Sequence, residues 1–389
     1  MVEMEKYKLG DICEIVSGST PKTNIDEYWE GTIKWITPAE LNDDTYIITD
    51  SVRKITELAV KKTGLKSFPE GTVILSSRAP IGKVAIAGCE MYCNQGFKNL
   101  ICSKKINNKY LYWFLKGNTV FLNSLGRGAT FKELSKSIVS NIEINLPDIV
   151  YQKKAVETLE KVSEIIALRK RELSSLDDLI KARFVEMFGD PATNPMRWSE
   201  TTIGDECFYI KDGPHKSLPD IGKENGGHPF ISVRNIVNGY IDFSTARYIS
   251  DEDYANAIKK CHPEKGDMLY SKGGTTGIAK LIDIDEEFAN WVHVAVLKFD
   301  KSKLNGIFFE KMLNGDYCFE QSQRLTKGIA NRDLVLSAMA QIKMYRPPME
   351  IQKQFADFVN QVDKSKVAIQ KALDKTQMLF DSLMQEYFG

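Results

Sequence analysis

The chain is 389 residues long, which exceeds one ordinary domain and fits two or three domains that each bury a core. Its 52 basic and 52 acidic residues balance, so any contact with nucleic acid must come from local patches rather than from net charge. No apolar run approaches the roughly 20 residues of a membrane span, and the charged start MVEMEKYKLG is unlike a signal peptide, so we expect no membrane contact and a cytoplasmic location.

The first 150 residues are typical of a mixed α+β domain. Short apolar runs bounded by Gly, Pro, Asn and Ser predict strands, among them GTVILSS, KVAIAG and IEINLP. The stretch from Lys109 to Leu125 predicts a helix. We therefore place the first globular domain at residues 1–150.

A long helix is predicted next, at residues 151–189. Positions spaced alternately three and four residues apart are mostly apolar, which is the period of a coiled-coil seam. These positions are Leu159, Val162, Ile166, Arg169, Leu173, Leu176, Ile180 and Arg183.

The second half of the chain repeats this order. A second globular domain at 190–348 contains the predicted strands GDMLYS and HVAVLKF, and a second helix follows at 349–389. Its seam positions are Val359, Val362, Lys366, Ile369, Leu373, Thr376, Phe380 and Leu383.

The two halves are copies of one unit, because matching residues recur at nearly constant spacing. NLPDIVYQKK (Asn145 to Lys154) resembles YRPPMEIQKQ (Tyr345 to Gln354), and WITPAEL resembles FISVRNI. Further equivalent pairs are Gly71 and Gly266, Ser76 and Ser271, Gly82 and Gly277, Leu134 and Leu334, Gln152 and Gln352, and Phe188 and Phe388.

Connectivity then predicts the topology. The first helix leads from the first domain to the second, so a second helix that packs against it must run back, and the pair is antiparallel. This gives two similar domains at opposite ends of a two-helix rod, related by an approximate two-fold axis. The alternative is two independent domains whose helical tails each pair with another protein.

Two similar but unequal heads suit B-DNA, whose half-sites one turn apart are about 34–36 Å centre to centre. Diverged heads would read different half-sites, which gives an asymmetric bipartite target with an unread spacer. The shape of the molecule thus favours double-stranded DNA as the partner.

The candidate DNA contacts are polar and basic residues in Gly-rich loops, where the backbone can approach phosphate and side chains can reach base edges. The alternative is that the glycines make tight turns and the charges are solvated. In the first domain the candidates are Ser19, Thr20, Lys22, Ser77, Arg78, Lys83, Asn94, Gln95, Lys98, Arg127, Thr130 and Lys132. In the second they are Lys211, His215, Lys216, Arg234, Asn235, Lys272, Thr275, Thr276, Lys327, Asn331 and Arg332. A further basic group from Arg53 to Lys66 is expected to be a solvated face, with phosphate contact as the alternative.

No motif for catalysis, a metal or a cofactor is recognised. The seven cysteines show no C-x-x-C spacing, and Cys89, Cys93 and Cys102 have no His within a hundred residues, so we expect reduced thiols and no metal site. GGTTGIAK lacks the spacing of a phosphate-binding loop, and TNPMRW is not the Asn-Pro-Pro-aromatic motif of amino-methyltransferases. We expect a chain that binds without reacting.

The motifs KLGDICEIVSGSTPK, GTVILSSRAPIGKVAI and LPDIVYQKKAVETLEKV, and their duplication, resemble the specificity subunit of type I restriction-modification systems over nearly the whole chain. The resemblance implies two target recognition domains, each reading half of a bipartite site, and two helices that set the spacer. It also implies docking of two methyltransferase subunits and, through them, motor-nuclease subunits, with no catalytic residue in this chain. The second domain departs from the first at KDGPHKS, where the first has SGSTPK.

Two other classes of function compete with this interpretation. The first is a protein-interaction scaffold with duplicated heads, which the neutral charge favours. The second is a divergent enzyme with an unrecognised nuclease or methyltransferase site. A mobility shift on random duplex at low salt separates DNA binding from a scaffold, and methyl transfer by the purified chain would support an enzyme.

Overall fold

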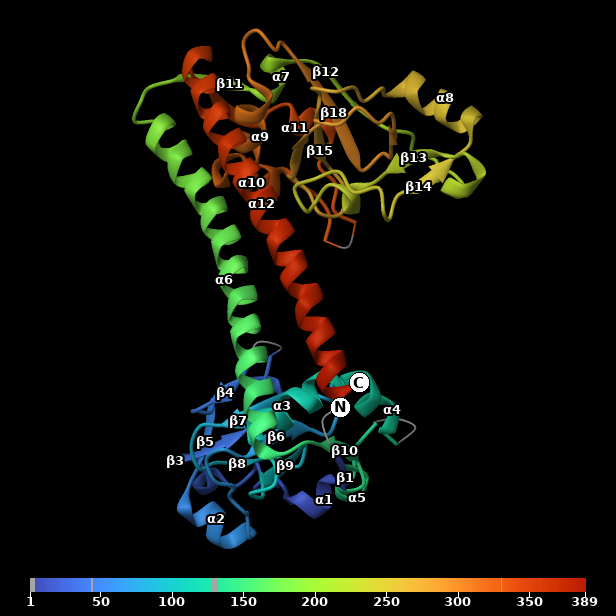
Figure 1. Cartoon of the computed structure of the whole chain (residues 1–389). Coiled ribbons are helices and arrows are strands. Elements are labelled where there is room, and N and C mark those ends of the chain that lie inside the picture. Colours follow the sequence, from blue (N-terminus) through green and yellow to red (C-terminus); the bar gives the residue numbers. More distant parts are fainter. Residues whose placement is uncertain (1–3, 43–44, 128–131, 330) are drawn as a thin grey trace. The chain divides into compact units, whose positions relative to one another are not determined.

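The computed structural model describes residues 4–42, 45–127, 132–329 and 331–389 (Figure 1). The chain divides into two compact units, one formed by Met1–Lys170 with Lys371–Gly389 and the other by Arg171–Gln370. Each unit therefore holds one globular head together with one end of each long helix. No helix in the described part of the chain is both long enough and apolar enough to cross a membrane.

The head of the first unit is built on a five-stranded sheet of order β2-β9-β6-β7-β4, beside a three-stranded sheet of order β5-β3-β8 and the two-stranded pair β1-β10. Its strands are β1 (Glu5–Lys8), β2 (Cys13–Ser17), β3 (Trp29–Ile36), β4 (Ile47–Ile48), β5 (Arg53–Ile55), β6 (Val73–Ser76), β7 (Val84–Ala87), β8 (Tyr92–Cys93), β9 (Phe97–Cys102) and β10 (Glu143–Leu146). Its helical elements are α1 (Leu9–Ile12), η1 (Asp26–Tyr28), η2 (Pro38–Glu40), α2 (Glu57–Thr63), α3 (Asn108–Gly117), α4 (Thr119–Leu125) and α5 (Lys136–Ser140).

The head of the second unit repeats this plan with sheets of order β12-β18-β15-β16, β14-β13-β17 and β11-β19. Its strands are β11 (Ser199–Thr202), β12 (Cys207–Asp212), β13 (His228–Ile231), β14 (Arg247–Ile249), β15 (Met268–Ser271), β16 (Ala279–Leu281), β17 (Ala289–Asn290), β18 (Val294–Phe299) and β19 (Lys343–Arg346). Its helical elements are α7 (Ile203–Glu206), η3 (Lys223–Asn225), η4 (Val233–Asn235), α8 (Asp251–Lys260), α9 (Gly306–Asn314), α10 (Asp316–Leu325) and α11 (Leu336–Met339).

The central strands of both heads are apolar on both sides because both faces of the sheet are covered. In β6 Val73 and Leu75 pack in one hydrophobic cluster and Ile74 packs in another, and all three are fully buried. Such strands read as continuous apolar runs rather than as alternating ones. This explains why GTVILSS and GDMLYS predicted strands correctly.

One predicted helix is broken in the structure. The stretch from Lys109 to Leu125 forms two helices, α3 and α4, which meet at Asn118. Asn118 has φ −103° and ψ 23°, and its side-chain amide donates to the carbonyl of Phe114. Gly117 precedes it, and a glycine followed by an asparagine that bonds its own helix is typical of a helix end.

The two long helices, α6 (Ile149–Phe188) and α12 (Met349–Phe388), are each 40 residues long. In the first unit Tyr151 contacts the ring of Tyr387, and Arg169 donates to Thr376 and to the carbonyl of Ala372. In the second unit Asp177 pairs with Lys366 at 2.6 Å. Residue numbers rise along one helix as they fall along the other, so the predicted antiparallel pairing is confirmed.

The last turns of each long helix enter the core of a head. In the first unit the ring of Phe388 lies 4.9 Å from that of Tyr110 in α3. In the second unit the ring of Phe188 lies 4.8 Å from that of Phe308 in α9. The two helices thus end against equivalent helices of the two heads, α3 and α9. Burial of these aromatic rings contributes much of the free energy that holds each helix end to its head.

Candidate nucleic-acid interface

Two loops carry most of the candidate contacts, and the first follows β6 in one head and β15 in the other. In the first head the backbone N–H of Lys83 donates to Ser76 Oγ at 2.8 Å, and in the second the N–H of Ile278 donates to Ser271 Oγ at 2.8 Å. Gly82 and Gly277 close the two loops at φ 95° and 90°, a region that other residues rarely adopt. The repeated serine and glycine therefore fix one loop shape twice.

The second loop is closed by paired backbone hydrogen bonds at its two ends. Arg127 and Glu133 exchange both hydrogen bonds in the first head, as do Lys327 and Asp333 in the second. This loop is attached to the first one through the N–H of the next residue. Leu134 donates to the carbonyl of Ser77 at 2.8 Å, and Leu334 donates to that of Lys272 at 2.7 Å. Both heads thus hold the two loops side by side.

A partly buried ion pair stiffens the junction of the two loops. In the first head the ammonium of Lys98 lies 3.4 Å from Glu133, which also pairs with Arg78 at 3.0 Å. In the second head Lys272 lies 2.9 Å from Asp333 and 3.6 Å from Asp212. The lysine is Lys98 of strand β9 in the first head and Lys272 of the first loop in the second head. The two heads thus make equivalent ion pairs from positions that are not equivalent in sequence.

A third element, a single turn of 3-10 helix, presents one residue beside these loops. In η2 the N–H of Thr37 donates to Glu40 Oε1, and in η4 the N–H of Ser232 donates to Asn235 Oδ1, both at 2.8 Å. Side-chain caps of this kind fix the entry of the chain into the turn. The exposed position inside the turn is Ala39 in the first head and Arg234 in the second.

In the second head these three elements surround a cavity of about 570 Å³. Trp291 and His293 form an aromatic wall with ring centroids 4.9 Å apart, and a smaller cavity adjoins it beside Arg247. The larger cavity is lined by Ser232, Val233, Arg234, Gly273, Gly274, Trp291, His293, Asn331, Arg332 and Asp333.

The electrostatic character of this surface is cationic. Asp333 is paired with Lys272, which leaves Arg234 and Arg332 as the net charges on the lining. A nearby carboxylate, Asp220, has its pKa lowered by the backbone N–H groups of Tyr248 and Gly222, and further by Arg247 and Arg234. A groove with these charges attracts anions.

Half of the twelve candidates of the first head are exposed. Lys83 is half-buried and its ammonium donates to the carbonyls of Leu41 and Pro38, so it holds the fold together. Ser77 and Lys98 are buried, and Thr130 lies outside the described residues. Thr20 and Asn94 are half-buried. The exposed candidates are Ser19, Lys22, Arg78, Gln95, Arg127 and Lys132.

In the second head three candidates are buried and serve the fold. Asn235 caps its own turn, Lys272 makes the ion pair, and the hydroxyl of Thr276 lies 3.0 Å from that of Thr326. We therefore do not keep these three, or Ser77, Lys83 and Lys98, as candidate contacts. The exposed candidates are Lys211, His215, Lys216, Arg234, Thr275, Lys327, Asn331 and Arg332.

Three residues of the cationic surface were missed by the sequence analysis. Arg247, Trp291 and His293 lie in or beside strands, whereas the predicted contacts came from Gly-rich loops. Register would have identified Trp291 and His293, because both come just before the start of β18, as Asn94 and Gly96 come just before the start of β9. Asn94 was a candidate, so its counterpart qualified as well.

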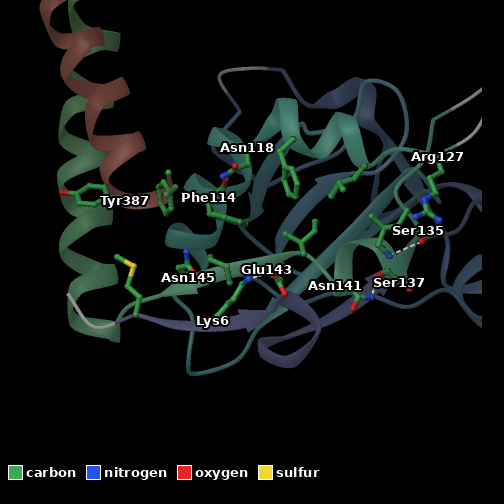
Figure 2. A pocket seen from close by; sticks show the side chains of 18 of the residues that line it. Lys6, Phe114, Asn118, Arg127, Ser135, Ser137, Asn141, Glu143, Asn145 and Tyr387 are labelled. Carbon is green, nitrogen blue, oxygen red and sulfur yellow. Dashed lines mark hydrogen bonds and ion pairs between the residues drawn. The ribbon is translucent and has the colours of Figure 1, made fainter. Parts of the chain in front are cut away.

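The first unit has a cavity of about 990 Å³ at a different place, between α4, β10 and the end of α12 (Figure 2). Phe114, Asn118 and Tyr387 line it, with Glu143 of β10. In the second unit the side-chain amide of Gln321 in α10 donates to the carbonyl of Lys343 and accepts from its N–H.

No group of three or more His, Cys, Asp or Glu side chains with the arrangement of a metal site occurs among the described residues. The cysteines are all unpaired thiols. Five of them, at positions 13, 93, 207, 261 and 318, are buried.

Comparison with known proteins shows which family has this architecture. The family model described as the type I restriction modification DNA specificity domain matches residues 1–177 and again residues 195–376, one match for each copy. A type I restriction enzyme specificity subunit of Methanocaldococcus jannaschii, MjaIX, is 30% identical, with 97% of this chain and 90% of that protein covered. A second one from the same organism, MjaVIII, is 23% identical with 97% and 92% covered.

Solved structures agree in fold. The S subunit of a type I restriction-modification system from M. genitalium superposes with a TM-score of 0.59 at 16% identity, covering 100% of this chain and 96% of that one. A chain from a structural study of complex assembly and conformational transition of the type I R-M system gives 0.60 at 18% identity, covering 99% and 97%. With both copies matched by the family model and a relative matched along nearly its full length, this chain belongs to the specificity subunits of type I restriction-modification systems.

Proposed function

We propose that each head reads one half of an asymmetric bipartite site in double-stranded DNA. The observation that carries this proposal is that the two heads share one loop framework but carry different exposed cations on it. Arg78 and Lys132 occupy the loops of the first head, and Arg234 and Arg332 surround the cavity of the second. Equal frameworks with unequal side chains suit two half-sites of different sequence, because phosphate contacts position a protein and base contacts specify the sequence.

The long helices set the length of the unread spacer between the half-sites. At 1.5 Å per residue, 40 residues span about 60 Å. Their antiparallel seam holds Arg169 against Thr376 and Asp177 against Lys366, so sliding by one turn would break both polar contacts. A helix pair with a fixed register is a suitable ruler.

The outer faces of the same helices are the docking surface for two methyltransferase subunits, through which motor-nuclease subunits join in the cytoplasm. Apolar side chains that are about half exposed recur on α6 and α12, and exposed apolar surface is typical of a protein interface. The side chains are Ile165, Leu168, Leu179, Val185, Val367, Met378 and Leu379. Specificity subunits are recognition components without catalysis of their own, so methylation and cleavage belong to these partners.

The test is a methylome measured by modified-base sequencing in cells that express this chain with the neighbouring methyltransferase gene. The comparison is with cells that lack only this chain. We expect a two-part motif with a fixed spacer that is methylated only when the chain is present. Methylation at the same motif without the chain would contradict the proposal, as would a single continuous motif.

A further inference from the structure

Register between the two copies identifies which positions face the cavity. Ser77 donates its N–H to the carbonyl of Gly96 in the first head, and Lys272 donates to that of His293 in the second. His293 therefore stands where Gly96 stands. The same alignment of loops and capped turns pairs Ala39 with Arg234, Arg78 with Gly273, Asn94 with Trp291 and Lys132 with Arg332.

Framework positions and cavity positions differ in how similar their residues are between the two heads. Residues that build the framework are the same or similar in both heads, such as Ser76 and Ser271, Gly82 and Gly277, and Leu134 and Leu334. Of the paired positions on the lining, these five differ, whereas Ser232 and Asp333 have the similar residues Thr37 and Glu133 as counterparts. The same fold forms with either side chain at these five positions, so we attribute the difference between the heads to the ligand that each one binds.

The two arginines of the cavity are braced by the protein. Nη2 of Arg234 donates to the carbonyl of Thr245, and Nη2 of Arg332 donates to Gln323 and lies 3.5 Å from the hydroxyl of Thr276. The remaining N–H groups of both guanidiniums have no hydrogen bond to any described residue. Bracing lowers the entropy lost on binding and leaves donors of each fork available.

The aromatic wall contains polar atoms without partners. Trp291 Nε1 and His293 Nδ1 are buried and make no hydrogen bond within the described residues. A buried indole N–H usually has an acceptor. Arg247 lies 5.7 Å from the centre of the Trp291 ring and donates to Ser217, which fixes the far side of this wall.

We propose that Arg234 and Arg332 read guanine in the half-site of the second head, with Trp291 and His293 as the wall that positions the base pair. The inference rests on the proposed function. Guanine presents two acceptors, N7 and O6, on its major-groove edge, and the arginine fork matches them with two hydrogen bonds. Adenine instead presents a donor beside its acceptor, which a guanidinium cannot satisfy. The first head has Ala39 and Lys132 at these positions and therefore reads another sequence.

The first experiment uses the chain in complex with its methyltransferase subunits and measures the methylome of Arg332→Ala and Arg234→Ala. We expect each variant to relax one guanine of one half-site by about 10–100-fold, the worth of a bidentate contact. The other half-site keeps its sequence, which also shows that the variant folds. Arg324→Ala is the matched control, because Arg324 lies in α10 outside the cavity lining and pairs with Glu320 in solvent.

The second experiment needs no variant. Duplexes in which each guanine of the motif is replaced in turn by 7-deazaguanine lack the N7 acceptor, and we expect the wild-type complex to bind about tenfold more weakly at the guanines that the arginine variants relax. Without any bipartite motif in the wild type, the proposed function fails. A bipartite motif that lacks guanine in both halves, or whose guanines are insensitive to both tests, overturns this inference alone.

Discussion

Gln152 and Gln352 are equivalent residues that make the same three hydrogen bonds in the two units. Each is fully buried, and each accepts at 2.8 Å from the N–H of the asparagine that caps a head helix, Asn107 or Asn305. Their amide groups donate to Pro147 and Lys105 in one unit and to Pro347 and Lys303 in the other. One side chain thereby joins a long helix to its head.

Removing this amide leaves buried backbone groups without partners. We expect Gln152→Leu and Gln352→Leu each to lower the free energy of unfolding by about 2–4 kcal/mol, because an unsatisfied buried group costs about 1–3 kcal/mol. Chemical denaturation measures the loss. The exposed neighbours provide the control, since Lys153→Ala and Lys353→Ala should change stability by less than about 0.5 kcal/mol. Equal stability of the leucine variants and the controls would contradict the assignment.

The ion pair at the loop junction should matter more in the second head than in the first. Lys272→Met leaves the half-exposed Asp333 without its cation while Asp212 keeps Lys260, and we expect a loss of about 2 kcal/mol. Lys98→Met should lose less, about 1 kcal/mol, because Glu133 keeps Arg78. Thermal unfolding of these two variants and of the exposed control Lys327→Met ranks the three by their loss of stability. The reverse order would show that the cation is dispensable to the second head.

The helix pair offers a test of the spacer. One heptad inserted after Lys170 in α6 and one after Gln370 in α12 preserve the seam and lengthen the pair by about 10 Å. We expect the unread spacer to grow by about three base pairs at 3.4 Å each, with both half-sites unchanged. The methylome reads this directly.

A heptad inserted into α6 alone is the control for that experiment. The insertion lies between Arg169 and Asp177, so the contacts Arg169–Thr376 and Asp177–Lys366 can no longer form together, and methylation should fall rather than move to a new spacer. An unchanged spacer in the double insertion, with methylation intact, would show that the helices do not set the distance.

The thiols report whether both heads are packed as described. Burial raises the pKa of Cys93, Cys207 and Cys318 to about 12 and that of Cys261 to about 11, since a buried thiolate is disfavoured. These groups therefore stay protonated and unreactive at pH 8. With a disulfide reagent we expect fast reaction only at the partly exposed Cys89 and Cys102. Cys89→Ser and Cys102→Ser should each remove one fast thiol, and fast reaction at Cys318 would mean an open core.

Features that depend on local periodicity could be predicted from the sequence. The seam of α6 was recognisable because Leu159, Val162 and Ile166 recur at helical spacing, and all three are buried. Arg169 and Thr376 were both predicted as seam positions, but their contact could not be predicted, because it depends on the register between two helices far apart in the chain.

The cavity could not be predicted for a similar reason. Ser232, Gly273, Trp291 and Arg332 meet only because β13 pairs in parallel with β17 while β15 pairs with β18. Strand order of this kind is not visible in a single sequence. The burial of Lys98 was also unforeseen, since its strand is covered on both faces and a lysine in FKNLIC suggested an exposed side.

The interleaving of the two units has a consequence for the order in which the chain is made. The first unit takes its last segment, Lys371–Gly389, from beyond the whole of the second unit, and Phe380, Leu383, Met384, Tyr387 and Phe388 of that segment pack against its core. A ribosome delivers every residue of the second unit before it delivers these five. The core of the first head therefore lacks these five side chains until the whole second unit has been synthesised, so the head that is synthesised first is the one completed last.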